Sequence, residues 1–139
     1  MALDPADNVP TPASADASLD LARTSARTAD AMKADRTTLL AVGDVLSIAE
    51  YFVICSASNR RLVRAVVDEI EAKVREAHGR SPVRVEGASE QQWVLVDYGD
   101  VVVHVFVEDV RAYYEIERLY RDVPRLEWEI EAPLPLPPT

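Results

Sequence analysis

The side chains that could carry out chemistry in this chain do not lie at the spacings that a catalytic or metal-binding site requires. The two histidines, His78 and His104, fall in different predicted elements, and neither has a partner at metal-ligand spacing. Cys55 is the only cysteine and lies in an apolar run, which excludes a disulfide framework and a CxxC metal site. The four glycines form no phosphate-binding loop. We therefore predict no catalytic residues, no metal site and no cofactor.

A predicted β-hairpin at residues 93–106 points instead to binding. Two runs of β-branched and aromatic residues flank Gly99-Asp100, which suits a two-residue turn. The side-chain period of two then separates two faces. One face is almost entirely valine, with Tyr98, and suits a core. The other face mixes aromatic, imidazole and carboxylate groups, a mixture that no core requires, so we predict a docking surface for another protein. Its residues are Trp93, Leu95, Asp97, His104 and Phe106.

Trp93 is the expected anchor of this surface, because an indole is large, stiff and able to donate one hydrogen bond. The alternative is that a helix covers this face and buries the indole. His104 is expected either as a half-buried strand residue with a satisfied ring nitrogen or as a partner contact. Tyr98, Tyr114 and Glu117 are predicted to flank the docking surface, although tyrosine at helical spacing is more often part of a core.

The formal charge of −9 is concentrated in the second half of the chain. Residues 1–85 carry 12 acidic and 11 basic groups, net −1, whereas residues 86–131 carry 12 acidic and 4 basic groups, net −8. This distribution disfavours direct or sequence-specific nucleic-acid binding, for which basic side chains supply most of the affinity. It favours a basic protein partner, whose encounter complementary charge would steer. The alternative is a solvated acidic surface that only aids solubility.

The order of predicted elements indicates an α/β protein with a single domain. Its mixed sheet should contain about five strands, accompanied by three helices. Ser58 or Asn59 should cap the central helix, and Gly79 should end it. The predicted helices cover residues 18–35, about 59–78 and 108–123, and the predicted strands cover 37–42, 50–55, 82–86 and the two arms of the hairpin.

The ends of the chain have a different composition from the middle. Residues 1–17 are rich in Ala, Asp, Pro and Ser and are predicted to be disordered. Residues 124–139 form a Pro-rich tail, in which 133–138 should be extended polyproline. The N-terminus lacks the basic start and apolar run of a signal peptide, and no apolar segment approaches the roughly 20 residues needed to cross a membrane. We expect a cytoplasmic domain at 18–123.

Several motifs follow one another in a characteristic order along the chain. They are Glu50-Tyr-Phe-Val-Ile-Cys55-Ser56, Ser58-Asn59-Arg60, Glu86-Gly87, the segment from Trp93 to Phe106, and Arg111-Ala-Tyr-Tyr114-Glu-Ile-Glu117-Arg-Leu-Tyr120. Together they resemble the ribosomal silencing factor family, also called Iojap-like, over about residues 18–123. The chain departs from the usual family pattern at Glu50, Ala57 and Tyr120, where the family commonly has Asp, Gly and Trp.

The resemblance implies a topology related to nucleotidyltransferases but without their catalytic residues. It also implies binding to the large ribosomal subunit through ribosomal protein L-fourteen, which would block joining of the small subunit and repress translation when nutrients are short. Two alternatives stay open. One is a nucleotidyltransferase-like enzyme that binds metal and nucleotide with carboxylates such as Glu86 and Asp97. The other is a homodimeric scaffold in which two copies of the docking surface pair.

Overall fold

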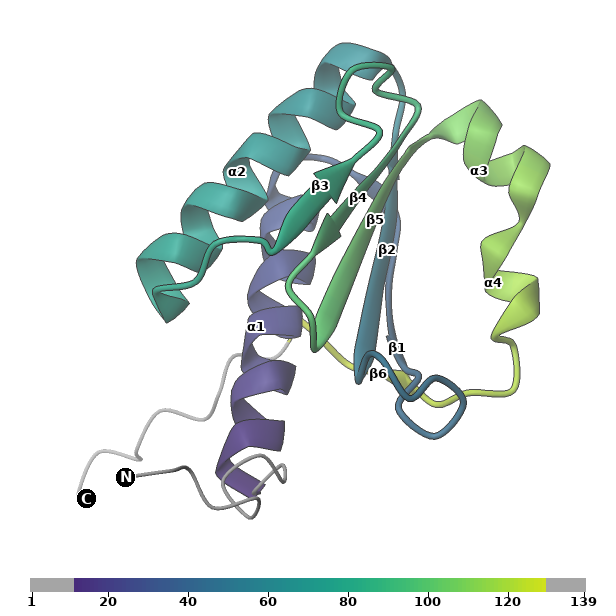
Figure 1. Cartoon of the computed structure of the whole chain (residues 1–139). Coiled ribbons are helices and arrows are strands. Elements are labelled where there is room, and N and C mark those ends of the chain that lie inside the picture. The colour runs from purple at the N-terminus through teal and green to yellow at the C-terminus, as the bar shows by residue number, and fades with distance from the viewer. Residues whose placement is uncertain (1–11, 130–139) are drawn as a thin grey trace, which may run out of the picture.

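The computed structural model describes residues 12–129, which form one mixed sheet with helices on both sides (Figure 1). The strands lie in the order β3-β4-β5-β2-β1-β6. Helices α1 and α2 cover one face, and α3 and α4 lie on the other. The elements are α1 Pro12–Ala31, β1 Asp35–Ala41, β2 Tyr51–Ala57, α2 Arg60–His78, β3 Arg84–Glu86, β4 Trp93–Asp97, β5 Val101–Val107, α3 Glu108–Tyr114, α4 Ile116–Leu119 and β6 Arg125–Leu126.

The predicted α/β class and mixed sheet are confirmed, with six strands instead of about five. Strands β2 and β5 run parallel, whereas the other neighbouring strands pair antiparallel. The hairpin has the predicted register, in which Trp93 pairs with Phe106, Leu95 with His104 and Asp97 with Val102. The two predicted faces therefore exist as expected, because each residue of a strand points to the side opposite its neighbours.

The valine face of the hairpin forms the main core with α1 and α2. Small residues of α1, including Ala22, Ala26 and Ala29, are fully buried and let this helix lie close to the sheet. The amphipathic pattern of α2 is also confirmed. Asn59 caps its start by accepting a hydrogen bond from the Leu62 amide at 2.8 Å, and Gly79 ends it with a left-handed backbone, φ +65°.

The prediction of one continuous third helix is wrong. Glu115 adopts a left-handed conformation, φ +46°, which ends α3 and starts the single turn of α4. A non-glycine residue in this region costs energy and needs support from its surroundings. Ile116, directly after the break, is buried in the second core cluster between these helices and the sheet. The break therefore accompanies the packing of Ile116 into this cluster directly after α3 ends.

The folded part of the chain extends beyond both predicted boundaries of the domain. Helix α1 begins at Pro12, inside the stretch predicted to be disordered. Beyond Pro124 the chain adds the edge strand β6, and Trp128 packs against the main core and donates a hydrogen bond from Nε1 to the Thr37 carbonyl at 3.1 Å. A lone tryptophan among charged residues gave no periodicity by which to extend the domain. The predictions for residues 1–11 and for the polyproline segment 133–138 lie outside the described residues.

Candidate docking site

Trp93 stands at the centre of an aromatic cluster on the sheet face opposite the valines. Its indole stacks on Phe106, with ring centroids 4.7 Å apart and planes inclined by 27°. The ring of Tyr114, from α3, approaches the indole to 5.3 Å. Trp93 is half-buried, so the indole is neither a fully exposed anchor nor fully buried by a helix. Helix α3 covers part of the indole and leaves the rest exposed. We call Trp93, His104, Phe106 and Tyr114 the aromatic cluster.

His104 holds the indole of Trp93 through a hydrogen bond. Trp93 Nε1 donates to His104 Nδ1 at 3.1 Å, and because an indole nitrogen can only donate, the neutral imidazole must carry its hydrogen on Nε2. That Nε2 is buried and has no hydrogen-bond partner among the described residues. Burial lowers the pKa of His104 from 6.5 to about 4, so the ring is neutral at pH 7. His104 therefore fixes the orientation of Trp93 from a buried position.

The structure separates the remaining predicted residues. Phe106 is fully buried under Trp93 and supports the surface from within. Leu95 is half-buried beside the aromatic cluster, and the carboxylate of Asp97 binds the Gly99 amide at 2.7 Å and Arg84 Nε at 3.2 Å. Tyr98 does not belong to this surface. It lies on the valine face, buried in the main core, and burial raises its pKa to about 12.

Glu117 is occupied within the molecule. Its carboxylate accepts a hydrogen bond from Nε of Arg111, a buried arginine of α3. Arg111 also donates to the carbonyls of Asp35 and Arg36, at 3.1 and 2.8 Å, and to the Ser56 hydroxyl at 3.1 Å. Burial raises the pKa of Glu117, but a backbone hydrogen bond and Arg111 outweigh this effect and lower it overall. Glu117 thus holds α4 to Arg111 of α3, and Arg111 fixes both helices to the start of β1.

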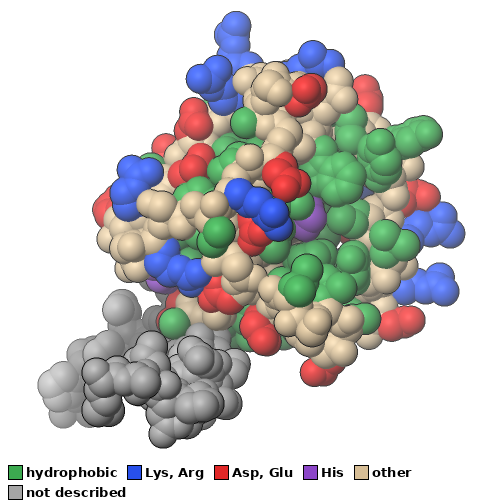
Figure 2. Space-filling model, in the orientation of Figure 1, with side chains coloured by type: hydrophobic (Ala, Val, Ile, Leu, Met, Phe, Trp, Pro, Cys, Tyr) green, Lys and Arg blue, Asp and Glu red, His purple; other side chains and the backbone are tan. Residues whose placement is uncertain are grey.

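Sequence reasoning missed a set of exposed apolar side chains on α3, on α4 and in the loop between β1 and β2. Ile48, Tyr113 and Leu119 expose 81%, 80% and 77% of their surface, and Val45 and Tyr114 are also exposed. Hydrophobic side chains gather on the side of the molecule that carries α3 and α4 (Figure 2). Exposed apolar groups at this density usually mark an interaction surface. The run Val45-Leu-Ser-Ile48 after a Gly-Asp turn could have indicated it. We call Val45, Ile48, Tyr113 and Leu119 the apolar rim.

The carboxylates of the enzyme alternative have other partners. Glu86 and Asp97 both approach Arg84 Nε, at 3.7 and 3.2 Å, so a cation already compensates their charge. Within residues 12–129 no group of three or more His, Cys, Asp or Glu side chains could hold a metal ion. Over the same residues, none of the helices has the length and apolar character to cross a membrane.

Comparison with known proteins identifies relatives for most of the chain. The family model described as "Ribosomal silencing factor during starvation" matches residues 15–136. The ribosomal silencing factor RsfS of Halalkalibacterium halodurans is 41% identical over 100 residues, 72% of this chain and 85% of the relative. The protein named mitochondrial assembly of ribosomal large subunit protein 1, from Mus musculus, is 33% identical over 73 residues, 51% of this chain and 32% of the relative.

A crystal structure of a protein from Chromobacterium violaceum is also similar, with a TM-score of 0.69 and 32% identity over 73% of this chain and 83% of that one. The relation to nucleotidyltransferases stays a prediction. The family resemblance carried by the hairpin and helix motifs is confirmed. The chain belongs to the ribosomal silencing factor family, a family of ribosome-associated regulators.

Proposed function

We propose that this protein represses translation by docking on ribosomal protein L-fourteen of the large subunit and so blocking access of the small subunit. The observation that carries the proposal is the half-buried indole of Trp93, which is fixed by His104 and Phe106 and adjoined by the exposed tyrosines of α3. Family membership supports a ribosomal partner. The name of the mouse relative supports the large subunit.

The aromatic cluster has the properties of an interface anchor. Binding must offset the entropy lost when side chains become ordered, at about 0.5–1.5 kcal/mol for each flexible side chain. The indole of Trp93 already has a hydrogen bond at 3.1 Å and a stacked neighbour at 4.7 Å, so little of its freedom remains to be lost. The exposed side chains of the apolar rim would add buried area to this contact along α3, α4 and the loop between β1 and β2.

Charge supports a basic protein as the partner. The second half of the chain, which includes α3 and α4, carries a net charge of −8 over residues 86–131. Glu108 and Asp109 lie on α3 with Tyr113, and Glu115 lies between α3 and the short helix α4 that carries Leu119. Such a field accelerates the encounter with a basic protein and opposes close contact with RNA phosphates. Docking on a ribosomal protein, away from exposed rRNA, fits this distribution.

Co-sedimentation with purified large subunits tests the docking site. Replacing Trp93 by alanine should weaken binding at least tenfold, since a central aromatic anchor contributes about 2 kcal/mol or more. Trp128→Ala is the matched control, because Trp128 is also a half-buried tryptophan but packs on the main core beside β6. It should leave binding unchanged in the folded protein. Equal binding by folded Trp93→Ala and by the unsubstituted protein would show that the docking site lies elsewhere.

The consequence of docking is tested separately with isolated subunits. Light scattering on mixing small and large subunits should show that the protein prevents joining and that Trp93→Ala does not. Isolated ribosomal protein L-fourteen should compete with large subunits for the protein. If large subunits bind the protein but L-fourteen does not compete, the partner is a different ribosomal component. Sedimentation over a range of concentrations shows whether the same surface also pairs with a second copy, in which case Trp93→Ala would weaken self-association as well.

A further inference from the structure

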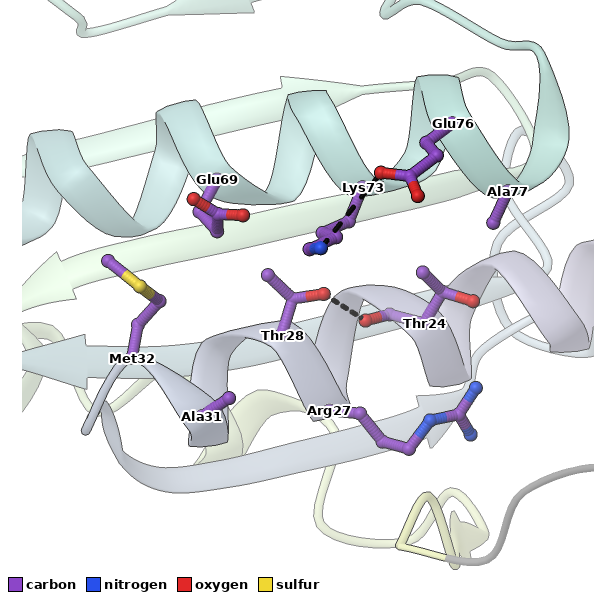
Figure 3. Close-up of a pocket in the computed structure, with 9 residues that line it drawn as sticks. All are labelled: Thr24, Arg27, Thr28, Ala31, Met32, Glu69, Lys73, Glu76 and Ala77. Carbon is purple, nitrogen blue, oxygen red and sulfur yellow. Dashed lines mark hydrogen bonds and ion pairs between the residues drawn. The ribbon is translucent and has the colours of Figure 1, made fainter.

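The layer of the molecule away from the docking site contains a groove between α1 and α2. It has a volume of about 480 Å³, and the side chains of the two helices face each other across it (Figure 3). Thr28 and Ala31 have short side chains and leave this hollow, whereas the Thr24 hydroxyl lies 2.8 Å from Nε2 of His78 at the end of α2. Ala31 and Ala77 are exposed, and Met32 is partly exposed. The groove is lined by Thr24, Arg27, Thr28, Ala31, Met32, Glu69, Lys73, Glu76 and Ala77.

The end of the described chain is attached to the rim of this groove. Arg23 Nε donates to the Glu127 carbonyl at 3.1 Å, and Arg27 Nη1 donates to the Trp128 carbonyl at 3.4 Å. Arg27 also lines the groove, and its side chain extends from α1 on the side away from α2 (Figure 3). Residues 127–128 thus lie beside α1, one helix width from the groove. The ten residues 130–139 follow directly.

We propose that the proline- and leucine-rich segment 130–139 of the chain itself binds in this groove. An extended polyproline chain advances about 3.1 Å per residue. Residues 130–133 can therefore cross the roughly 10 Å width of α1. The α1 side of the groove runs from Thr24 to Met32, about 12 Å at 1.5 Å per residue, and four further residues in polyproline conformation span it. Leu134 and Leu136 are then the side chains that reach the groove.

The exposed surface of the groove is mostly apolar, although six of its nine lining residues are polar or charged, and the chemistry of the segment fits this apolar surface. Polyproline has three residues per turn, so Pro133 and Leu136 share one edge of the helix, Leu134 and Pro137 a second, and Pro135 and Pro138 the third. Both leucines can thus face the groove while the third edge faces water. From 133 to 138 only the two leucines have a backbone N–H, so binding leaves few donors without a partner. Because a polyproline chain is already stiff, it loses little conformational entropy when it binds.

The segment is favoured over a separate partner because the chain already holds it next to the groove. A tethered segment acts at an effective concentration in the millimolar range. A weak apolar contact of this size can therefore be occupied within one molecule when the same peptide in solution would bind poorly. This binding lies on the layer opposite the docking site, so the proposal does not depend on the proposed function.

Disulfide trapping tests the proposal directly. Ala77→Cys places a thiol on the α2 side of the groove, and Leu134→Cys places the second in the segment, both in a Cys55→Ala background. The matched control combines Leu134→Cys with Ala112→Cys, an exposed position on α3. We expect an intramolecular disulfide to form in the Ala77 variant at least tenfold faster than in the control. Equal rates, or disulfide-linked dimers in place of the intramolecular product, would overturn the proposal, the latter by showing that a second copy supplies the segment.

Amide chemical shifts give a second measurement without new cysteines. Removing residues 130–139 should shift the amides of 24–32 and 69–77 and leave those of α3 and α4 unchanged. A synthetic peptide of residues 130–139, added at millimolar concentration to the truncated protein, should reverse these shifts. The same peptide with both leucines replaced by aspartate should not. If truncation leaves the α1 and α2 amides unchanged, the segment does not occupy the groove.

Discussion

The two faces of the sheet are built from different chemistry, although the same strands supply both. The face toward α1 and α2 is aliphatic, with Val94, Val96, Val103 and Val105 buried under two long helices. The face toward α3 and α4 carries aromatic rings, a histidine and a half-buried leucine, and two short helices cover it only in part. The first face is complete within the molecule. The second leaves apolar surface for a partner.

The difference shows how a small domain can stay folded and still offer an apolar surface. Valine packing is non-directional and stabilises in proportion to the area removed from water. The second face instead positions its groups by directed contacts, such as the Trp93–His104 hydrogen bond and the four partners of Arg111. Directed contacts hold the half-buried indole in place although α3 covers it only in part. The first face therefore supplies most of the core, and the second carries the surface that we propose for docking.

The largest expected effect comes from Arg111, which attaches α3 and α4 to the sheet. Arg111→Met should lower the free energy of unfolding by about 3–5 kcal/mol, because it removes a buried guanidinium and leaves the Glu117 carboxylate and two carbonyls without their partner. Arg118→Met is the matched control, since Arg118 forms an exposed ion pair with Glu115 at 3.0 Å on the next helix. For Arg118→Met, urea denaturation should show that the free energy of unfolding falls by less than about 1 kcal/mol. Similar effects at both positions would mean that α3 and α4 are not held by directed contacts.

Acid should weaken the second face through His104. The folded pKa is about 4 and the ordinary value is 6.5, so between these pH values the unfolded chain binds more protons than the folded one. Stability is therefore complete above about pH 6.5 and declines as the pH falls toward 4. One pKa unit corresponds to about 1.4 kcal/mol, which gives a loss of about 3 kcal/mol from this site. Denaturation with urea at a series of pH values measures it.

His104→Leu provides the comparison for this pH dependence. It removes the titrating group from the aromatic cluster, so the slope of stability against pH between 6.5 and 4 should be shallower than in the unsubstituted protein. His78 contributes in the same direction, because burial lowers its pKa as well, and it remains in both proteins. The difference between the two curves therefore isolates His104. Parallel curves would show that protons reach His104 without disturbing the fold.

The first face could be predicted from the sequence because it depends on a period of two. Alternating valines fix which side chains point inward, and the Gly99-Asp100 turn fixes the register, so the pairing of Trp93 with Phe106 followed directly. The cap at Asn59 and the stop at Gly79 were equally predictable, because each depends on the local chemistry of a single residue. Local preferences of this strength persist in the folded protein when the packing around them agrees.

The candidate site could be predicted only in part, since its coverage depends on contacts distant in sequence. The position of α3 over the sheet decides that Phe106 is buried and that Trp93 is only half-buried. Arg111 fixes this position by binding carbonyls some 75 residues earlier in the chain. The assignment of Tyr98 to the docking surface conflicted with the alternation itself, which already placed it among the valines. The break at Glu115 had no sequence pattern, because glutamate rarely adopts that backbone conformation.

A smaller effect compares the two faces at adjacent positions of β5. Val103 is fully buried on the first face, and Val102, next to it, is half-buried on the second. Threonine preserves the branched shape of valine and adds a hydroxyl. Val103→Thr should cost about 1–3 kcal/mol, since the main core offers the hydroxyl no partner, and Val102→Thr should cost less than about 1. Urea denaturation of both variants checks this. Equal losses of stability in the two variants would mean that the two faces of the sheet do not differ in how completely they exclude water.

The smallest expected effect concerns affinity alone and compares two exposed aliphatic side chains. Ile48 belongs to the apolar rim and exposes 81% of its surface, whereas Val83 exposes 75% and precedes β3, whose Val85 packs against the main core. Serine at either position should change the free energy of unfolding by no more than about 0.5 kcal/mol, because little is buried there.

Ile48→Ser should nevertheless weaken binding to large subunits about fivefold, which corresponds to about 1 kcal/mol for partial burial of one aliphatic side chain. Val83→Ser should bind as the unsubstituted protein does. Equal binding by both variants would confine recognition to the aromatic cluster, whereas a loss at Val83 would place part of the partner over the face that α1 and α2 cover.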